Sequence, residues 1–234
     1  MIDFHTHIIP FVDDGAKDLA EAIKMLYMLK SQGVKTVVAT PHYNDSRIDI
    51  DGFLMLRNAA YLKLQQEIAQ KGHDLPEVIL GAEVFLSYEV IHNDGLSKLC
   101  IGDTNYLLVE VPSNVWFEWI YDFTDYLISQ KNIKPIIAHF ERYAFVNRDI
   151  DRFNNIKESD VVIQVNADAF LNFRMKKTAH RLVENGLLHI IASDTHNTTD
   201  RKPVILEAKK QIVKKYGEKK WEEICNNARE ILFV

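Results

Sequence analysis

Seven short apolar runs, separated by longer stretches with helical periodicity, dominate the 234-residue sequence. Near-continuous apolar runs of this length are typical of strands in a parallel sheet whose two faces are both covered. Strands that alternate with helices favour an α/β fold. The predicted strands are residues 1–5, 35–40, 77–83, 105–111, 134–139, 161–166 and 188–194.

The stretches between these strands predict amphipathic helices. In residues 18–32, for example, Leu19, Ile23 and Leu26 share one face, and Gly33 ends the pattern. No internal repeat, low-complexity segment or linker divides the chain, so we expect a single domain over residues 1–234. The predicted helices are residues 18–32, 52–71, 116–130, 174–185, 202–216 and 218–232.

Composition excludes several classes of protein. The formal net charge is −5 and no basic stripe is visible, so we expect no nucleic-acid partner. No apolar run reaches the roughly 18 residues of a membrane span, and no signal-peptide pattern opens the chain. The two cysteines, Cys100 and Cys225, form neither a disulfide framework nor a C-x-x-C motif. These features predict a soluble cytoplasmic protein without membrane insertion.

Six of the seven predicted strands end in residues that commonly bind metal ions. The exception is the strand at 161–166, which offers only the weaker candidates Asn166 and Asp168. In a β/α barrel the carboxyl ends of all strands converge on one face, whereas an open sheet spreads them along a line. One converging site therefore favours a barrel. The candidate ligands are His5, His7, Asp14, His42, Glu83, Glu110, His139, Asp194 and His196.

Each motif alone has a simpler explanation, such as a polar loop at H-x-H or a strand-to-loop turn at "ATPHY". Glu110 is harder to explain in this way, because a carboxylate in an apolar strand is costly unless it is paired or bound to a metal. The simpler explanations would have to hold at six strand ends together, which favours a metal site. We assign structural roles to the remaining histidines, His73, His92, His180 and His189.

The ligand set contains nitrogen and oxygen but no thiolate, which fits Mn, Fe or Zn. Nine ligands exceed the capacity of one ion, so two or three ions that share carboxylates are expected. A cysteine-based phosphatase is excluded, because C-x5-R would require arginine where Tyr106 and Ile231 stand.

Six motifs in this order resemble the PHP (polymerase and histidinol phosphatase) superfamily: "DFHTH", "GVKTVVATPHY", "GAEV", "LVEV", "AHFERY" and "ASDTH". Within it, "HIIPFVDDGAKDLAEAIKML" and "AHFERY" resemble the bacterial manganese-dependent tyrosine phosphatases of capsule and exopolysaccharide biosynthesis, the CpsB/YwqE-like group. The resemblance covers nearly the whole chain. Two departures are Phe140, where the group is expected to have proline, and residues 43–51, which carry no family signature.

This resemblance implies a distorted seven-stranded (β/α)7 TIM-like barrel with three metal ions, most readily Mn, at the carboxyl ends of the strands. It also implies that Arg142 and Arg201 hold the phosphate. The implied ligand groups are His5, His7, Glu83 and Asp194 for one ion, Asp14, His42 and His196 for a second, and Glu83, Glu110 and His139 for a third.

Three divalent ions would outweigh the four carboxylates and attract a phosphate dianion. A hydroxide that bridges two ions is then expected to attack the phosphorus of a phosphotyrosine protein, most readily the tail of a bacterial tyrosine kinase. A phenolate leaving group, with a pKa of about 10, departs without a strong general acid. The alternatives are a histidinol-phosphate phosphatase, a phosphodiesterase or nuclease of the same superfamily, and an inactive metal-binding scaffold.

Overall fold

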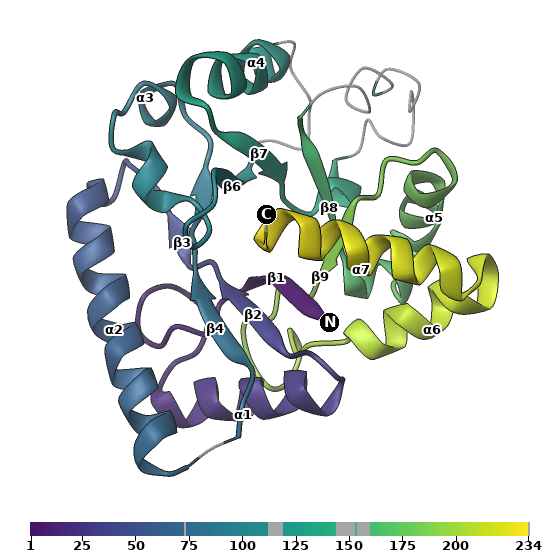
Figure 1. Cartoon of the computed structure of the whole chain (residues 1–234), viewed down its shortest axis with the longest axis horizontal. Coiled ribbons are helices and arrows are strands. Elements are labelled where there is room, and N and C mark those ends of the chain that lie inside the picture. Colours follow the sequence, from purple (N-terminus) through teal and green to yellow (C-terminus); the bar gives the residue numbers. More distant parts are fainter. Residues whose placement is uncertain (73, 112–118, 144–152, 154–159, 234) are drawn as a thin grey trace.

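The computed structural model describes residues 1–72, 74–111, 119–143, 153 and 160–233. Its strands are all parallel and form a curled sheet system with helices around the outside (Figure 1). The strands are β1 (Ile2–Thr6), β2 (Thr36–Ala39), β3 (His42–Tyr43), β4 (Glu77–Leu80), β5 (Glu83–Phe85), β6 (Tyr106–Glu110), β7 (Lys134–Ile137), β8 (Val162–Asn166) and β9 (Ile190–Ala192).

The helices follow the predicted periodic stretches closely. One short helix, α3, was not predicted, and the first residues of the predicted helix 116–130 lie outside the described residues. The helices are α1 (Leu19–Ser31), α2 (Ile50–Gln70), α3 (Tyr88–Ile91), α4 (Trp119–Lys131), α5 (Lys176–Glu184), α6 (Ile205–Tyr216) and α7 (Glu218–Leu232).

Local chemistry accounts for the ends of α1. The Asp18 side chain accepts a hydrogen bond from the backbone N–H of Glu21 (2.7 Å) and so caps the first turn. Five apolar residues of the helix are buried on one face. Gly33 follows with a φ of 85°, a left-handed conformation that glycine adopts without strain, and the chain turns there into β2.

The pairing of strands departs from the predicted seven-stranded barrel. A three-stranded sheet has the order β1-β2-β4, and a six-stranded sheet has the order β3-β5-β6-β7-β8-β9. The predicted strand 35–40 is β2, and a further short strand that was not predicted, β3, follows Pro41; the predicted strand 77–83 is broken at Gly81 and Ala82, which lie between β4 and β5. The pairing therefore defines a curled parallel α/β fold with two sheets rather than one continuous seven-stranded sheet.

Backbone hydrogen bonds nevertheless continue the pairing at the break and connect the two sheets at the first and last strands. Gly81 N–H donates to the Ala39 carbonyl (2.8 Å), which extends the pairing of β2 with β4 up to the break before β5. At the other junction, His7 N–H donates to the Thr195 carbonyl (2.9 Å), which holds the end of β1 beside the segment after β9. The ends of the first and last strands are thus neighbours.

The inner face of the curled sheets is apolar over the first part of the strands. There Phe4, Val38, Leu108, Ile136 and Ile190 belong to one buried group, which we call the inner cluster. Ala228, Ile231 and Leu232 of α7 complete this group, and α7 lies across the end where the strands begin (Figure 1). The opposite end, where the strands finish, carries the polar residues.

None of the helices in the described parts of the chain combines the length and the apolar character that a bilayer crossing requires.

Candidate metal centre

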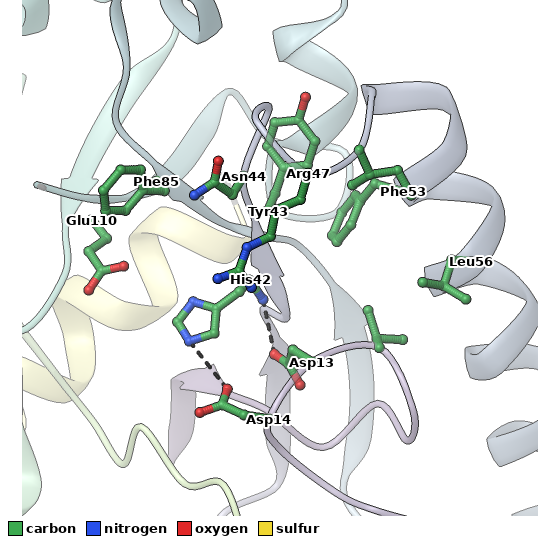
Figure 2. Close-up of a pocket in the computed structure, with 12 residues that line it drawn as sticks. Asp13, Asp14, His42, Tyr43, Asn44, Arg47, Phe53, Leu56, Phe85 and Glu110 are labelled. Carbon is green, nitrogen blue, oxygen red and sulfur yellow. Dashed lines mark hydrogen bonds and ion pairs between the residues drawn. The ribbon is translucent and has the colours of Figure 1, made fainter.

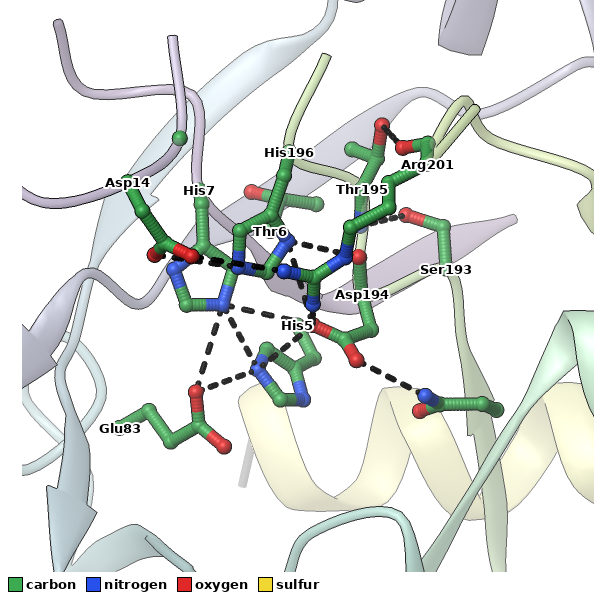
Figure 3. A network of polar contacts seen from close by, with 12 residues as sticks. His5, Thr6, His7, Asp14, Glu83, Ser193, Asp194, Thr195, His196 and Arg201 are labelled. Carbon is green, nitrogen blue, oxygen red and sulfur yellow. Dashed lines mark hydrogen bonds and ion pairs between the residues drawn. The ribbon is translucent and has the colours of Figure 1, made fainter. Parts of the chain in front are cut away.

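The carboxyl ends of the strands deliver all nine candidate ligands to one region. β1 carries His5 and leads into His7, β3 begins with His42, and β5 begins with Glu83. β6 ends at Glu110, and His139 follows β7, while Asp194 and His196 follow β9. Asp14 comes from the loop after β1, and Figure 3 shows it beside the histidines.

Glu83 lies at the centre of this region and is 1% exposed. Its Oε2 atom is 2.9 Å from His5 Nε2 and 3.0 Å from His42 Nδ1. Its Oε1 atom is 3.0 Å from His139 Nε2. A buried carboxylate is costly unless it is paired, and here imidazoles surround it on several sides.

The first group of donor atoms has the spacing of a metal site. His5 Nε2 and His7 Nε2 lie 3.0 Å apart, and Asp194 Oδ1 lies 3.5 Å and 3.4 Å from them. His7 Nε2 is also 3.3 Å from Glu83 Oε2. Ligands about 2.1 Å from a shared tetrahedral ion lie about 3.4 Å from one another. His5, His7 and Glu83 are therefore spaced as ligands of one ion, and Asp194 lies beside both rings.

Hydrogen bonds on the outer side of the rings orient their Nε2 atoms toward this possible ion position. His5 Nδ1 donates to the Gln164 side-chain oxygen (3.3 Å), and His7 Nδ1 donates to Asp13 Oδ2 (2.6 Å). The protons of two neutral rings then lie on Nδ1, so two Nε2 lone pairs face each other at 3.0 Å. Two facing lone pairs repel unless a shared proton or a metal ion lies between them, so the pair fits a protonated ring in the metal-free protein and two ligands of one ion in the metal-bound protein.

A second group contains His196, Asp14 and His42. The Nε2 atoms of both rings lie 3.5 Å from Asp14 Oδ1, and the ring of His7 stacks on His196. His196 donates from Nδ1 to the Asp194 carbonyl (2.9 Å), while its buried Nε2 atom accepts no hydrogen bond. Because this nitrogen faces inward without a partner, it also fits a metal ligand.

The third group surrounds Glu110. His139 Nε2 lies 3.5 Å from Glu110 and 3.0 Å from Glu83. His42 also shares a possible ion position with these two carboxylates. The structure thus brings the implied ligands into one region, but groups them differently. The sets close enough to share one ion are His5, His7 and Glu83; His7, Asp14, His42 and His196; and His42, Glu83 and Glu110, with Asp194 and His139 beside them.

Close packing of the first loop explains how Asp13 and Asp14 reach the centre. A Cβ atom on Gly15 would lie 2.1 Å from the His7 carbonyl oxygen, so the loop folds back this tightly only with glycine. The Gly15 N–H donates to Asp13 Oδ1, and the His42 N–H donates to Asp13 Oδ2 (3.0 Å). Asp13, for which sequence analysis gave no role, therefore orients two histidines.

Gln164 is a second residue without a sequence-based role. Its side-chain oxygen accepts from His5 Nδ1 and from the His139 N–H (2.8 Å), and its amide donates to Asn166. Asn166 then donates to Asp194 Oδ2 (2.9 Å). The only sequence signal for this role was a polar residue inside the apolar run "VVIQVN". β8 therefore contributes residues that orient the candidate ligands through hydrogen bonds. Asp168, the other weak candidate, forms no part of the three groups.

Two candidate ligands have unusual backbone conformations. His139 has a φ of 35° and Asp194 a φ of 52°, values that are rare for residues other than glycine. Such conformations persist where the surroundings enforce them and are common at functional sites. Phe140, the departure from the expected proline, is buried next to His139 and packs edge-on against Phe153 (5.3 Å).

Both candidate arginines reach the centre through Asp194. Arg142 pairs with Asp194 Oδ2 at 2.5 Å, and Arg201 lies 3.3 Å from Oδ1 and 3.5 Å from Asp14. Each side chain remains about one-third exposed. These contacts place both guanidinium groups at the edge of the centre.

Protonation in the metal-free protein follows from these contacts. Burial lowers the pKa of His7, but hydrogen bonds to Asp13, Asp194 and Glu83 outweigh it and raise this pKa well above its ordinary value. Burial also lowers the pKa of His139, but hydrogen bonds to Glu110 and Glu83 outweigh it and raise this pKa to about 9. Conversely, burial would raise the pKa of Glu83, but the histidines hold it well below its usual range.

The other histidines within the described residues lie outside this centre. His189 accepts a hydrogen bond from the Ile163 N–H, His180 contacts Tyr216, and His92 contacts the Tyr88 carbonyl. His73 lies outside the described residues. Burial raises the pKa of the Cys100 thiol to about 12, so it is not a reactive thiolate.

Fold and site together define a parallel α/β protein. At the carboxyl ends of its strands, histidines and carboxylates form a centre of the kind that binds metal ions. The chain belongs to the CpsB/CapC family of capsular polysaccharide synthesis, whose family model matches residues 1–233.

Curated relatives align along nearly the whole chain. Tyrosine-protein phosphatase CpsB of Streptococcus pneumoniae is 30% identical over 99% of this chain and 98% of its own length. Tyrosine-protein phosphatase YwqE of Bacillus subtilis is 28% identical over 99% of this chain and 91% of its own length.

Solved structures agree with this relationship. A structure described as YwqE from Bacillus subtilis and CpsB from Streptococcus pneumoniae, unique metal-dependent tyrosine phosphatases, has a TM-score of 0.85 and 28% identity. The match covers 98% of this chain and 93% of the other. A putative histidinol phosphatase from Listeria monocytogenes, at 14% identity, 84% and 95% coverage and a TM-score of 0.52, shares the fold.

The role of Asp13 gives a first prediction. Asp13→Asn should weaken Mn²⁺ binding by roughly 10- to 100-fold, because an amide cannot accept the hydrogen bonds that orient His7 and His42 as strongly as a carboxylate. Calorimetric titration of the metal-free protein measures this affinity. Asp125→Asn, at an exposed site on α4, is the matched control, and equal affinity in both variants would contradict the role.

The raised histidine pKa values give a second prediction. At pH 7 the metal-free protein should hold protons on His7 and His139 that metal binding must displace, whereas Glu83 and Asp194 are already ionised. Mn²⁺ binding should therefore release protons, and its affinity should rise as the pH increases from 7 to about 9. Calorimetry in two buffers of different ionisation enthalpy measures the protons. Binding without proton release would show the assignment to be wrong.

Proposed function

We propose that this protein is a metal-dependent phosphomonoester hydrolase that removes phosphate from tyrosine residues of proteins. The observation that carries the proposal is the pair of inward-facing Nε2 atoms of His5 and His7, 3.0 Å apart beside Glu83 and Asp194. The tyrosine phosphatases CpsB and YwqE, which align along nearly the whole chain, support the choice of substrate.

The proposed architecture is one PHP-type domain over residues 1–234. In this view β2 with β3, and β4 with β5, are two interrupted strands of a distorted seven-stranded barrel. The hydrogen bond from Gly81 to Ala39 and the bridge between Thr6 and Thr195 support it, since they continue the pairing at the breaks.

The proposed cofactor is a set of three divalent ions, with Mn favoured and Fe or Zn also compatible with nitrogen and oxygen ligands. Bound ions would supply an activated water and would offset the charge of the phosphate oxygens. The proposed ligand groups are His5, His7, Glu83 and Asp194; Asp14, His42 and His196; and Glu83, Glu110 and His139, with His42 near the last group as well.

The protein's own part in the reaction is to hold and orient the phosphate. Arg142 and Arg201 contact Asp194 at the edge of the centre, and a cation bound to Asp194 would reduce their attraction to it. Their planar donor groups would then bind the phosphate oxygens and stabilise the charge of the transition state. Because a tyrosine phenolate leaves with a pKa of about 10, the mechanism requires no strong general acid.

The proposed partner is a phosphotyrosine protein of capsule or exopolysaccharide synthesis, such as the tail of a tyrosine kinase. Membership of a capsular polysaccharide synthesis family supports this context. The tyrosine phosphatase names of the relatives support the phosphotyrosine substrate.

A substrate panel tests the proposed function. The Mn-loaded protein should hydrolyse a phosphotyrosine peptide more efficiently than a phosphoserine peptide, histidinol phosphate or a bis-aryl phosphodiester. A strong chelator should abolish the activity and Mn²⁺ should restore it. Preference for histidinol phosphate or the diester would replace the proposed substrate, and full activity in metal-free protein would refute the metal-dependent mechanism.

The arginines give a further prediction. Arg142→Ala or Arg201→Ala should lower kcat/KM on the phosphotyrosine peptide by roughly 10- to 1000-fold while the bound metal remains, because a strong transition-state donor is lost. Arg142→Lys should not restore function, since lysine is a point charge rather than a planar donor group.

Arg229→Ala serves as the matched control, because Arg229 is exposed and lies on α7 at the other end of the sheets. Metal content and circular dichroism establish that each variant is loaded and folded. Wild-type efficiency in both Arg142→Ala and Arg201→Ala would show that the phosphate is not held by these residues.

A further inference from the structure

A pocket of about 720 Å³ adjoins the metal centre (Figure 2). Asp14, His42 and Glu110, candidate ligands of the second and third groups, form its polar side. The rest of its lining is mainly apolar, with Val12, Tyr43, Ile48, Phe53, Leu56 and Phe85, and Figure 2 shows Phe85 next to Glu110. A pocket that combines a charged centre with an apolar, partly aromatic lining is suited to a ligand with one anionic and one apolar end.

Arg47 also lines this pocket, and its guanidinium has no ion pair with any described residue. The three carboxylates of its own segment, residues 45–51, all have other partners. Asp45 accepts a hydrogen bond from Ser87, Asp49 caps the first turn of α2, and Asp51 pairs with Lys98. The unpaired guanidinium of Arg47 therefore lines the pocket beside the metal centre, where bound metal ions would repel it.

The backbone that carries Arg47 is held in place although the side chain is exposed. The Arg47 N–H donates to the Asn44 carbonyl (3.0 Å), and the Asn44 side chain accepts from both the N–H and the hydroxyl of Ser46. The bond from Ser87 to Asp45 (2.8 Å) ties the same turn to the start of α3. The segment that carries no family signature is thus an ordered turn that presents one arginine to the pocket.

We infer that this pocket is the subsite for the aryl ring of the substrate, and that Arg47 is a further substrate-binding residue that donates to the phosphate. The inference rests on the proposed function. An anion between Arg47 and the metal centre removes their mutual repulsion, and a guanidinium binds phosphate oxygens through paired N–H donors. The ring then lies against the apolar lining of the pocket, which includes Phe85 and Leu56, where its apolar surface is removed from water.

Arg47 differs from Arg142 and Arg201 in where it enters the site. Those two residues follow β7 and β9 and contact Asp194, whereas Arg47 follows β3 and lies in the pocket beside His42. A phosphate held from both directions has its ester oxygen, and with it the ring, directed into the pocket. This arrangement selects an aryl phosphate over a smaller phosphomonoester.

Binding of two inert ligands to the Mn-loaded protein tests the inference. Inorganic phosphate carries only the anionic end, and benzylphosphonate carries both ends without a hydrolysable ester. Arg47→Ala should raise the Kd of both ligands by about 10-fold or more, because each loses a charge-assisted hydrogen bond. Phe85→Ala should raise the Kd of benzylphosphonate by roughly 5-fold or more and leave that of phosphate unchanged.

Matched controls are available on α2. Lys63→Ala removes one exposed positive charge outside the pocket, and Leu62→Ala removes an exposed leucine outside it. Leu56→Ala, on the pocket side of the same helix, is the second test of the apolar wall and should weaken benzylphosphonate alone. Calorimetry measures each Kd, and metal analysis confirms that every variant is loaded.

The outcomes separate this inference from the proposed function. If Arg47→Ala behaves like Lys63→Ala toward both ligands, or weakens benzylphosphonate alone, Arg47 does not bind the phosphate. If Phe85→Ala and Leu56→Ala affect neither ligand, the pocket does not hold the ring. A wild-type protein that binds benzylphosphonate through these residues, yet hydrolyses no phosphotyrosine peptide, would refute the proposed function and leave the subsite intact.

Discussion

The buried carboxylate of Glu83 imposes the main constraint on this structure. It is 1% exposed and lies about 3 Å from side-chain nitrogens of His5, His42 and His139. A carboxylate in this position is stable only with cations around it, whether protonated imidazoles or metal ions. The strands that end here must therefore bring their polar residues to one place, and the surrounding hydrogen bonds must orient each ring.

Those hydrogen bonds come from β8, which contributes no candidate ligand, and from the loop after β1, which contributes only Asp14. Gln164 and Asn166 of β8 link His5, His139 and Asp194, while Asp13 holds His7. Such outer contacts select which ring nitrogen carries the proton and so direct the other toward the ion. The strand that was weakest in candidate ligands thus has an orienting role rather than a binding one.

Stability and chemistry occupy opposite ends of the curled sheets. The inner cluster around Phe4 and Leu108, covered by α7, is apolar, whereas the inner face becomes polar where the strands finish. Both interruptions, at Pro41 and at Gly81 and Ala82, fall directly before candidate ligands, His42 and Glu83. A break in the regular strand after Ala39 and after Leu80 changes the direction of the side chains that follow. These two breaks are where the fold departs from an ideal barrel.

Several helices could be predicted from the sequence almost to the residue, because their signals are local. The periodic stretch 218–232 is α7, and Asp18 and Gly33 mark the two ends of α1. α6 begins later than predicted, at Ile205, because its first turn is capped from outside. There the Gln32 side chain accepts a hydrogen bond from Leu206 and donates one to Pro203. No pattern within residues 202–216 could show this contact, which spans 174 positions.

The same distinction holds for the site. The sequence by itself determined the α/β alternation and the residue types at the strand ends, because periodicity and side-chain chemistry are properties of short segments. Only the tertiary structure decided which of these residues meet, that Asp13 and Gln164 orient them, and that Arg47 faces the same pocket as His42. The bond between His5 and Gln164 joins positions 159 residues apart, and such a contact exists only once the chain has closed β1 against β9.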